Sequence, residues 1–309
     1  MGQPLKLVFS LLIAVLLAFE VYSQDNAERD IAFEKVDSLI NLCRKNFFTD
    51  TEYARELATD ADDILSRFSD PAREAKIQNL YGITYDIQGN TDSSRHYFTK
   101  FYQKSLELGD LVSAGNALNN LGMSNWNSGR FDLALDYFFS SLNIADSLDD
   151  QSSKGKSFNN IGLIYQELND YPRSIEYHRK ALGIREELSS PEIPQSYNNI
   201  GICLNHLGYP DSALFYYQEG LELLNDREGK IKADLLHNMG NVYLEKGQLE
   251  RAETQCKLAL DNSTSALGAL LVHSTLSQIY FLKREPVNSI KSGLTALAYA
   301  DSLQTFGHL

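Results

Sequence analysis

Cysteine is scarce in this chain, with three residues in 309. Cys43, Cys203 and Cys256 are far apart, and each falls within a stripe of apolar residues. An odd number of cysteines without paired spacing argues against a disulfide framework and against a cysteine-based metal site. All three are therefore predicted to be small buried residues.

Positive charge is also in short supply. The chain has 28 Lys and Arg residues against 41 Asp and Glu residues, a formal net charge of −13. A strongly acidic surface repels phosphate backbones, so no nucleic acid is expected as a partner. The simplest interpretation of the charge is solubility, and the alternative is a basic protein partner.

Sequence motifs of catalysis are missing. The six histidines are scattered, and none forms an i, i+4 pair around a glutamate of the kind that binds zinc. No glycine-rich phosphate loop occurs either. The sequence therefore predicts a protein that is not an enzyme and that holds neither a metal ion nor a cofactor.

Long apolar runs are absent except at residues 7–19, where only Ser10 interrupts the run. Lys6 precedes it, and Val21 and Ser23 suit positions −3 and −1 of a cleavage site. A run of this length is short for a membrane span. Residues 1–23 are therefore predicted to be a signal peptide, with the rest of the chain exported to the periplasm or secreted. The alternative is an uncleaved signal that anchors the chain in a membrane.

What the chain does have is a motif that returns at a nearly fixed period. Residues 119–122 read Asn-Asn-Leu-Gly, and related motifs end at Gly162, Gly201 and Gly240, with fainter copies at Gly82 and Ser277. From Gly82 onward the steps are 40, 40, 39, 39 and 37 residues. Such a period indicates a repeat array, in which each unit buries its apolar face only against its neighbours.

Each unit contains two apolar stripes at helical spacing, separated by a short break. In the unit around Gly122, the break at residues 127–130 contains Gly129, which suits the end of a helix. Twelve positions after each marker residue the chain always places a small residue: Ser94, Ala134, Ser174, Ala213, Ala252 and Ser289. We therefore expect two helices per unit that cross closely, with the marker glycine of one facing the small residue of the other.

These features resemble the tetratricopeptide repeat, in which a large residue, a Leu-Gly pair, a tyrosine and two spaced alanines recur. The large residue corresponds to Leu118, Phe158, Tyr197 and Leu236, and the tyrosine to Tyr85, Tyr165, Tyr243 and Tyr280. Asn125 and Leu204 depart from the tyrosine position. The period is longer than the usual 34 residues, as in the similar repeats of kinesin light chains and of bacterial peptide-sensing repeat proteins.

The resemblance implies an all-α fold, a right-handed superhelical solenoid of about seven helical hairpins across residues 24–309. The expected repeats are 32–69, 72–109, 111–149, 151–189, 191–226, 229–263 and 266–303. Helix pairs of the HEAT type are the alternative.

The asparagines of the recurring motif are the candidate functional residues. The second asparagine stands one residue before the core leucine, which turns it about 100° away from the core, toward the concave side that first helices form. An amide side chain offers both a donor and an acceptor, so a ladder of amides can hold an extended peptide backbone. The predicted groove contains Asn120, Asn160, Asn199, Asn238, Asn241 and Gln278, with Trp126, Asn127, Glu167, His206 and Glu245 at its rim. The alternative is that the asparagines bond to neighbouring helices and set the register of the repeats.

Two functions remain open from the sequence. The first is an exported scaffold that binds a peptide or a protein segment in its groove. The second, which the resemblance to bacterial signalling proteins implies, is the sensory repeat region of a histidine kinase or transcriptional regulator whose membrane and output parts are not in this sequence. In the last helix, Ile290, Leu294 and Leu297 form an apolar stripe without a polar cap after it, which predicts self-association, a partner, or a chain cut short.

Overall fold

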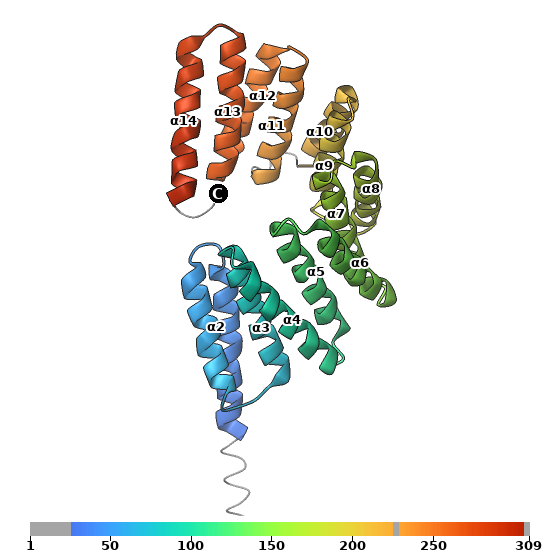
Figure 1. Cartoon of the computed structure of the whole chain (residues 1–309), viewed down its shortest axis with the longest axis vertical. Helices are drawn as coiled ribbons and strands as arrows, with labels where there is room; N and C mark the ends of the chain where they lie inside the picture. Colours follow the sequence, from blue (N-terminus) through green and yellow to red (C-terminus); the bar gives the residue numbers. More distant parts are fainter. Residues whose placement is uncertain (1–25, 225–228, 306–309) are drawn as a thin grey trace, which may run out of the picture. The chain divides into compact units, whose positions relative to one another are not determined.

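The computed structural model describes residues 26–224 and 229–305 (Figure 1). Within these residues every regular element is a helix, and there is no strand. The predicted all-α repeat fold is confirmed. The proposed signal peptide lies outside the described residues. No described helix combines the length and the apolar character that a membrane crossing requires.

The chain divides after Arg130 into two compact units. The first contains a helix over residues 26–46, followed by α2 (Thr51–Leu65), α3 (Pro71–Ile87), α4 (Thr91–Glu107) and α5 (Leu111–Asn127). The second contains α6 (Phe131–Ser147), α7 (Gln151–Glu167), α8 (Tyr171–Glu187), α9 (Ile193–His206), α10 (Pro210–Leu224), α11 (Lys230–Glu245), α12 (Leu249–Asn262), α13 (Ala266–Leu282) and α14 (Pro286–Thr305). In α3/α4, α7/α8, α9/α10, α11/α12 and α13/α14, a first helix packs on the second helix that follows it.

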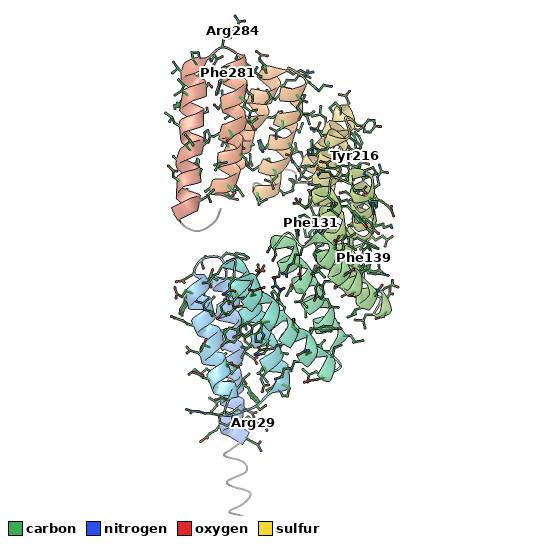
Figure 2. The ribbon with its side chains drawn as sticks, viewed as in Figure 1. Arg29, Phe131, Phe139, Tyr216, Phe281 and Arg284 are labelled. Carbon is green, nitrogen blue, oxygen red and sulfur yellow. The ribbon has the colours of Figure 1, made fainter. Side chains whose placement is uncertain are left out.

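Short polar signals start and end these helices. Asp70, Asp110 and Asp150 each accept a backbone N–H of the first turn of the following helix, which satisfies a donor that the helix itself leaves unpaired. The turns between helices need a residue with positive φ, and Gly129 and Arg284 both supply it, at φ 71° and 61°. Figure 2 shows Arg284 in the turn between α13 and α14, close to Phe281 at the end of α13.

The marker glycines make room for a large side chain from the second helix of the same hairpin. A Cβ atom at Gly201 would lie 2.4 Å from Cε1 of Tyr217, a side chain that is only 2% exposed. The same arrangement pairs Gly82 with Phe98, Gly162 with His178, and Gly240 with Cys256. The residue that faces each glycine is sixteen positions later in the sequence.

The expected pairing of glycine with the small residue twelve positions later is therefore incomplete. Ser174 does donate to the carbonyl oxygen of Gly162 at 2.8 Å. The bulk over the glycine nevertheless comes from a ring or thiol one helical turn further on, because i and i+4 share a helix face. The small residue lets the two backbones approach, and the glycine accepts the ring.

His178 differs from the other side chains of this series because both of its ring nitrogens are buried without a hydrogen-bond partner among the described residues. The side chain as a whole is fully buried. Burial lowers the pKa of His178 to about 3, with the positive charge of Arg185 as a second cause. The imidazole is therefore neutral over the physiological range.

All three cysteines are buried and unpaired. The thiol of Cys256 fills the position next to Gly240 where a Cβ atom would otherwise lie. Burial raises the pKa of this thiol to about 12. Burial likewise raises the pKa of Cys43 to about 11. The prediction that the cysteines serve as small core residues is confirmed.

Candidate functional site

The asparagines of the recurring motif form hydrogen bonds from one repeat to the next. In the first unit, Nδ2 of Asn120 donates to Oδ1 of Asn79 at 2.8 Å. In the second unit, Asn199 donates to Asn159 at 3.1 Å and Asn238 donates to Asn198 at 2.9 Å. Each bond joins the second position of one motif to the first position of the preceding motif.

A histidine and a threonine continue this series at the C-terminal end. Nε2 of His237, at the first position of its motif, lies 2.9 Å from Oγ1 of Thr275, at the second position of the next. Burial lowers the pKa of His237. A hydrogen bond joins its Nε2 to the Thr275 hydroxyl, with the donor set by the tautomer of the ring. The polar pairs therefore join successive first helices within each unit. That they set the register of the repeats stays a prediction.

This pairing limits what Asn199 can do for a ligand. Its side chain is 3% exposed, and its Oδ1 also accepts from Nε2 of Gln195 at 2.8 Å. Asn120 and Asn160, on α5 and α7, are half-buried. The structure thus places Asn199 between helices rather than on an open surface.

Five of the predicted groove residues do come together, in a pocket of the second unit with a volume of about 430 Å³. Its walls come from the first helices α9, α11 and α13, with Tyr217 of α10 below them. The predicted residues in its lining are His206, Asn238, Asn241, Glu245 and Gln278.

Amide groups dominate the polar part of this pocket. Gln278 is exposed and makes no hydrogen bond among the described residues. Asn241 uses only its Oδ1, which accepts from Thr275 at 3.1 Å, so its N–H₂ group is available to a ligand. Asn205 donates to Oε2 of Glu245 at 3.0 Å, while its own Oδ1 is buried without a partner. The pocket therefore offers both donors and acceptors.

The remaining lining is apolar. Ile202, Leu244 and Leu282 come from the three first helices, and Glu245 is the one acidic or basic residue besides His206. The ring of His206 stacks on Tyr171 at a centroid distance of 4.7 Å. A bound peptide backbone needs both hydrogen-bond donors and acceptors. A small apolar side chain of the peptide needs an apolar surface, here the floor formed by Ile202, Leu244 and Leu282. The lining supplies both.

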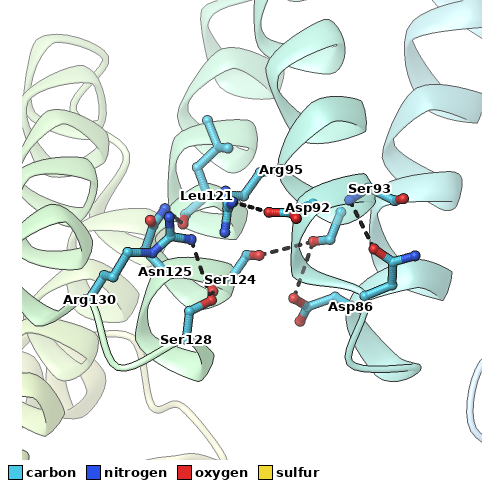
Figure 3. A network of polar contacts seen from close by, with 11 residues as sticks. Asp86, Asp92, Ser93, Arg95, Leu121, Ser124, Asn125, Ser128 and Arg130 are labelled. Carbon is cyan, nitrogen blue, oxygen red and sulfur yellow. Dashed lines mark hydrogen bonds and ion pairs between the residues drawn. The ribbon is translucent and has the colours of Figure 1, made fainter.

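The predicted residues of the first unit lie in a different setting. Asn127 is exposed, and its Nδ2 donates to Oδ2 of Asp86 at 3.1 Å. The other oxygen of Asp86 accepts from Ser94, whose hydroxyl also pairs with Ser124 at 3.1 Å (Figure 3). Burial raises the pKa of Asp86. Asn127 thus belongs to a network that ties α3, α4 and α5 together.

Trp126 is half-buried at the end of α5 in the first unit, and Glu167 is exposed at the end of α7 in the second. Neither lines the pocket in the second unit. Their assignment to a groove rim stays a prediction.

Sequence reasoning missed Arg185, which is 6% exposed. Its guanidinium donates to Oγ of Ser196 at 2.6 Å and pairs with Glu192 at 2.9 Å. Burial lowers its pKa, although the Glu192 carboxylate keeps it charged. The sequence does mark this residue, because other repeats have uncharged residues at this position of the second helix: Ser105, Ala145 and Leu224. An arginine there has to find acceptors in the next first helix.

No group of three His, Cys, Asp or Glu side chains that could hold a metal ion occurs within residues 26–224 and 229–305. The pocket is instead suited to recognising a neutral polar ligand by hydrogen bonds.

Family models of the tetratricopeptide repeat match residues 113–187, 156–226 and 233–263. The chain contains tetratricopeptide repeats. The curated protein sequences give no match to it.

Solved structures show the same fold as this tetratricopeptide repeat array. NprR in complex with its cognate peptide NprX has a TM-score of 0.61 at 16% identity, over 94% of this chain and 88% of NprR. Aspartyl phosphate phosphatase F from Bacillus subtilis has a TM-score of 0.68 at 17% identity, over 91% of this chain and 74% of its own. A signal transduction ATPase from Pyrococcus horikoshii, with a tetratricopeptide repeat sensor, has a TM-score of 0.69 at 19% identity. That alignment covers 90% of this chain and 44% of the ATPase.

Proposed function

We propose that this chain is an exported, non-catalytic scaffold that binds an extended peptide or protein segment in the pocket between α9, α11 and α13. The observation that carries the proposal is the set of amides in this pocket, of which Gln278 and Asn241 have unused hydrogen-bonding groups. Similarity of fold to NprR, which was crystallised with a peptide, supports a peptide as the ligand.

The mode of binding follows from the amide groups. A side-chain amide can donate to a backbone carbonyl and accept from a backbone N–H, and it does so without regard to the neighbouring side chain. Ile202, Leu244 and Leu282 would then accept one apolar side chain of the bound segment. Affinity would come mainly from hydrogen bonds to the backbone of the bound peptide. The apolar floor and Glu245 would determine which peptide sequences are preferred.

The pocket offers little for catalysis. Glu245 is engaged by Asn205 and faces no nucleophile in the lining, whereas hydrolysis or group transfer needs an activated nucleophile or an acid–base pair. Similarity of fold to an aspartyl phosphate phosphatase does not supply such residues. We therefore propose a binding role without chemistry.

The binding proposal is tested with a double substitution. Peptides are first selected from a random library on the purified chain, and their Kd is then measured by calorimetry. Replacing Asn241 and Gln278 together with alanine removes two ligand-facing amides, and each hydrogen bond contributes about 1 kcal/mol. We expect the Kd to rise by about 10-fold or more.

The matched control replaces Gln218 and Asn288 with alanine. Both are exposed amides on second helices, and each bonds only to a nearby glutamate of its own hairpin. The control should leave both the Kd and the thermal midpoint unchanged. The Asn241 and Gln278 variant should lose only the stability of one hydrogen bond, about 1 kcal/mol, because Asn241 Oδ1 accepts from Thr275 in the parent. Equal Kd values for the two double variants would remove this pocket as the binding site.

A second candidate function is the sensory repeat region of a signalling protein. The observation that favours it is the alignment of this chain with less than half of an ATPase that carries a tetratricopeptide repeat sensor. The intact mass of the protein from its own cells separates the two candidates and also tests export. A species that begins at Gln24 and ends at Leu309 supports an exported scaffold. A larger, membrane-bound species supports a sensor, and a species that still begins at Met1 contradicts signal cleavage.

A further inference from the structure

Helix α14 exposes a continuous apolar stripe. Four of its side chains are far more exposed than large apolar residues in a core: Val287 at 78%, Ile290 at 63%, Leu294 at 61% and Leu297 at 60%. The opposite face of α14 packs on α13, where Ser289 and Ser277 exchange hydrogen bonds with each other's carbonyl oxygens at 2.9 Å. The stripe therefore has no cover among the described residues.

Earlier repeats show what this face of a second helix does. Counted from the marker residues Gly201 and Ser277, Leu214 and Leu221 of α10 occupy the positions of Ile290 and Leu297. Those two leucines are half-buried and pack in one cluster with Leu235, Met239 and Val242 of α11. The part of this face that holds Ile290 and Leu297 thus packs against the next helix in an earlier repeat. Val287 and Leu294 extend it over positions that are polar and exposed in α10, where Asp211 and Gln218 stand.

The spacing of the stripe fits a helix of the same kind. The four residues follow each other at steps of three, four and three, which is the a/d pattern of a two-helix seam. Two copies of such a seam can interdigitate, because each presents the same series of apolar side chains to the other.

Charge also favours a second copy of this chain. The chain has a net charge of −13, so contact between most surfaces of two copies is opposed by repulsion. Between residues 286 and 300 the only formal charge is that of Lys291. This face is therefore a place where two copies can meet without bringing acidic side chains together.

From these observations we infer that the chain forms a two-fold symmetric dimer in which α14 of one copy packs on α14 of the other. The interface is isologous, so the same stripe is covered on both copies and association stops at two. Burial of four large apolar side chains on each copy drives the association.

The test measures the mass of the purified chain in solution by sedimentation as its concentration is raised. The parent chain should reach twice the monomer mass and no more. Replacing Ile290 and Leu294 together with glutamate should weaken dimerisation by about 100-fold, because like charges then face each other in an apolar seam. A mixture of this variant with the corresponding double lysine variant should recover the dimer.

The control variant is Leu258→Glu, which alters an exposed leucine, 43% accessible, on α12. It should dimerise like the parent, and all variants should keep the helical circular dichroism of the parent because the altered side chains are exposed. A parent that stays monomeric overturns the inference. Growth beyond two copies also overturns it, since that would indicate a head-to-tail contact of α14 with a different surface.

Discussion

Replacing His178 with phenylalanine should raise the free energy of unfolding by about 2 kcal/mol at pH 7. The imidazole is fully buried with both nitrogens unpaired, and each such polar group costs about 1–3 kcal/mol. Phe98 and Phe138 occupy the corresponding position in two other repeats, and Phe98 also lies over its marker glycine. A phenylalanine therefore suits this position and carries no polar atoms.

The difference between the two proteins should grow as the pH falls. The unfolded chain takes up a proton on His178 below a pKa near 6.5, whereas the folded chain does so only near pH 3. Because the unfolded state binds more protons in this window, stability falls with pH by about 1.4 kcal/mol per unit. From pH 7 to pH 5 the advantage of the phenylalanine variant should increase by about 2 kcal/mol.

Denaturant unfolding of both proteins at pH 7 and pH 5 measures this effect. The other titrating groups, including His237 and His273, are common to both proteins and cancel in the difference. If the two stabilities fall in parallel as the pH is lowered, His178 accepts a proton inside the folded protein and the account of its burial is wrong.

Replacing Gly201 with alanine should lower the free energy of unfolding by about 2–3 kcal/mol. The new Cβ would lie 2.4 Å from Cε1 and 2.8 Å from Cδ1 of Tyr217. The tyrosine is 2% exposed, so either its ring or the two helix backbones have to shift to relieve the contact. Overpacking of this kind costs about 1–3 kcal/mol, occasionally more.

Gly183 supplies a matched control on α8. A Cβ added there meets nothing within 4 Å, so Gly183→Ala should show only the helix preference for alanine. It should stabilise the protein by about 1 kcal/mol. Denaturant unfolding of the two variants gives the comparison. A loss at Gly183 similar to that at Gly201 would contradict the assignment of the effect to the Tyr217 ring.

The period and the two apolar stripes of each repeat were enough to predict the helical hairpins, because helical periodicity and turn residues are local properties of the chain. The partner of each marker glycine was not predicted, since Gly201 and Tyr217 meet only through the packing of two helices. The ring sixteen positions later could have been noticed as a regular series in Phe98, Phe138, His178 and Tyr217.

The binding site could be predicted only in part for a related reason. The two asparagines of each motif are adjacent in the sequence. Each of the two side chains can point toward a neighbouring repeat. Whether Asn199 meets a ligand or Asn159 depends on the distance between first helices, which the sequence does not encode locally. Asn241 and Gln278 stand further along their helices, beyond the paired positions, and there the predicted amides do line a pocket.

The most direct test of the central proposal is a crystal structure of the chain with a library-selected peptide. The proposal predicts an extended peptide across α9, α11 and α13, with its backbone hydrogen-bonded to Asn241 and Gln278. A peptide bound elsewhere, with this pocket left free, would contradict it.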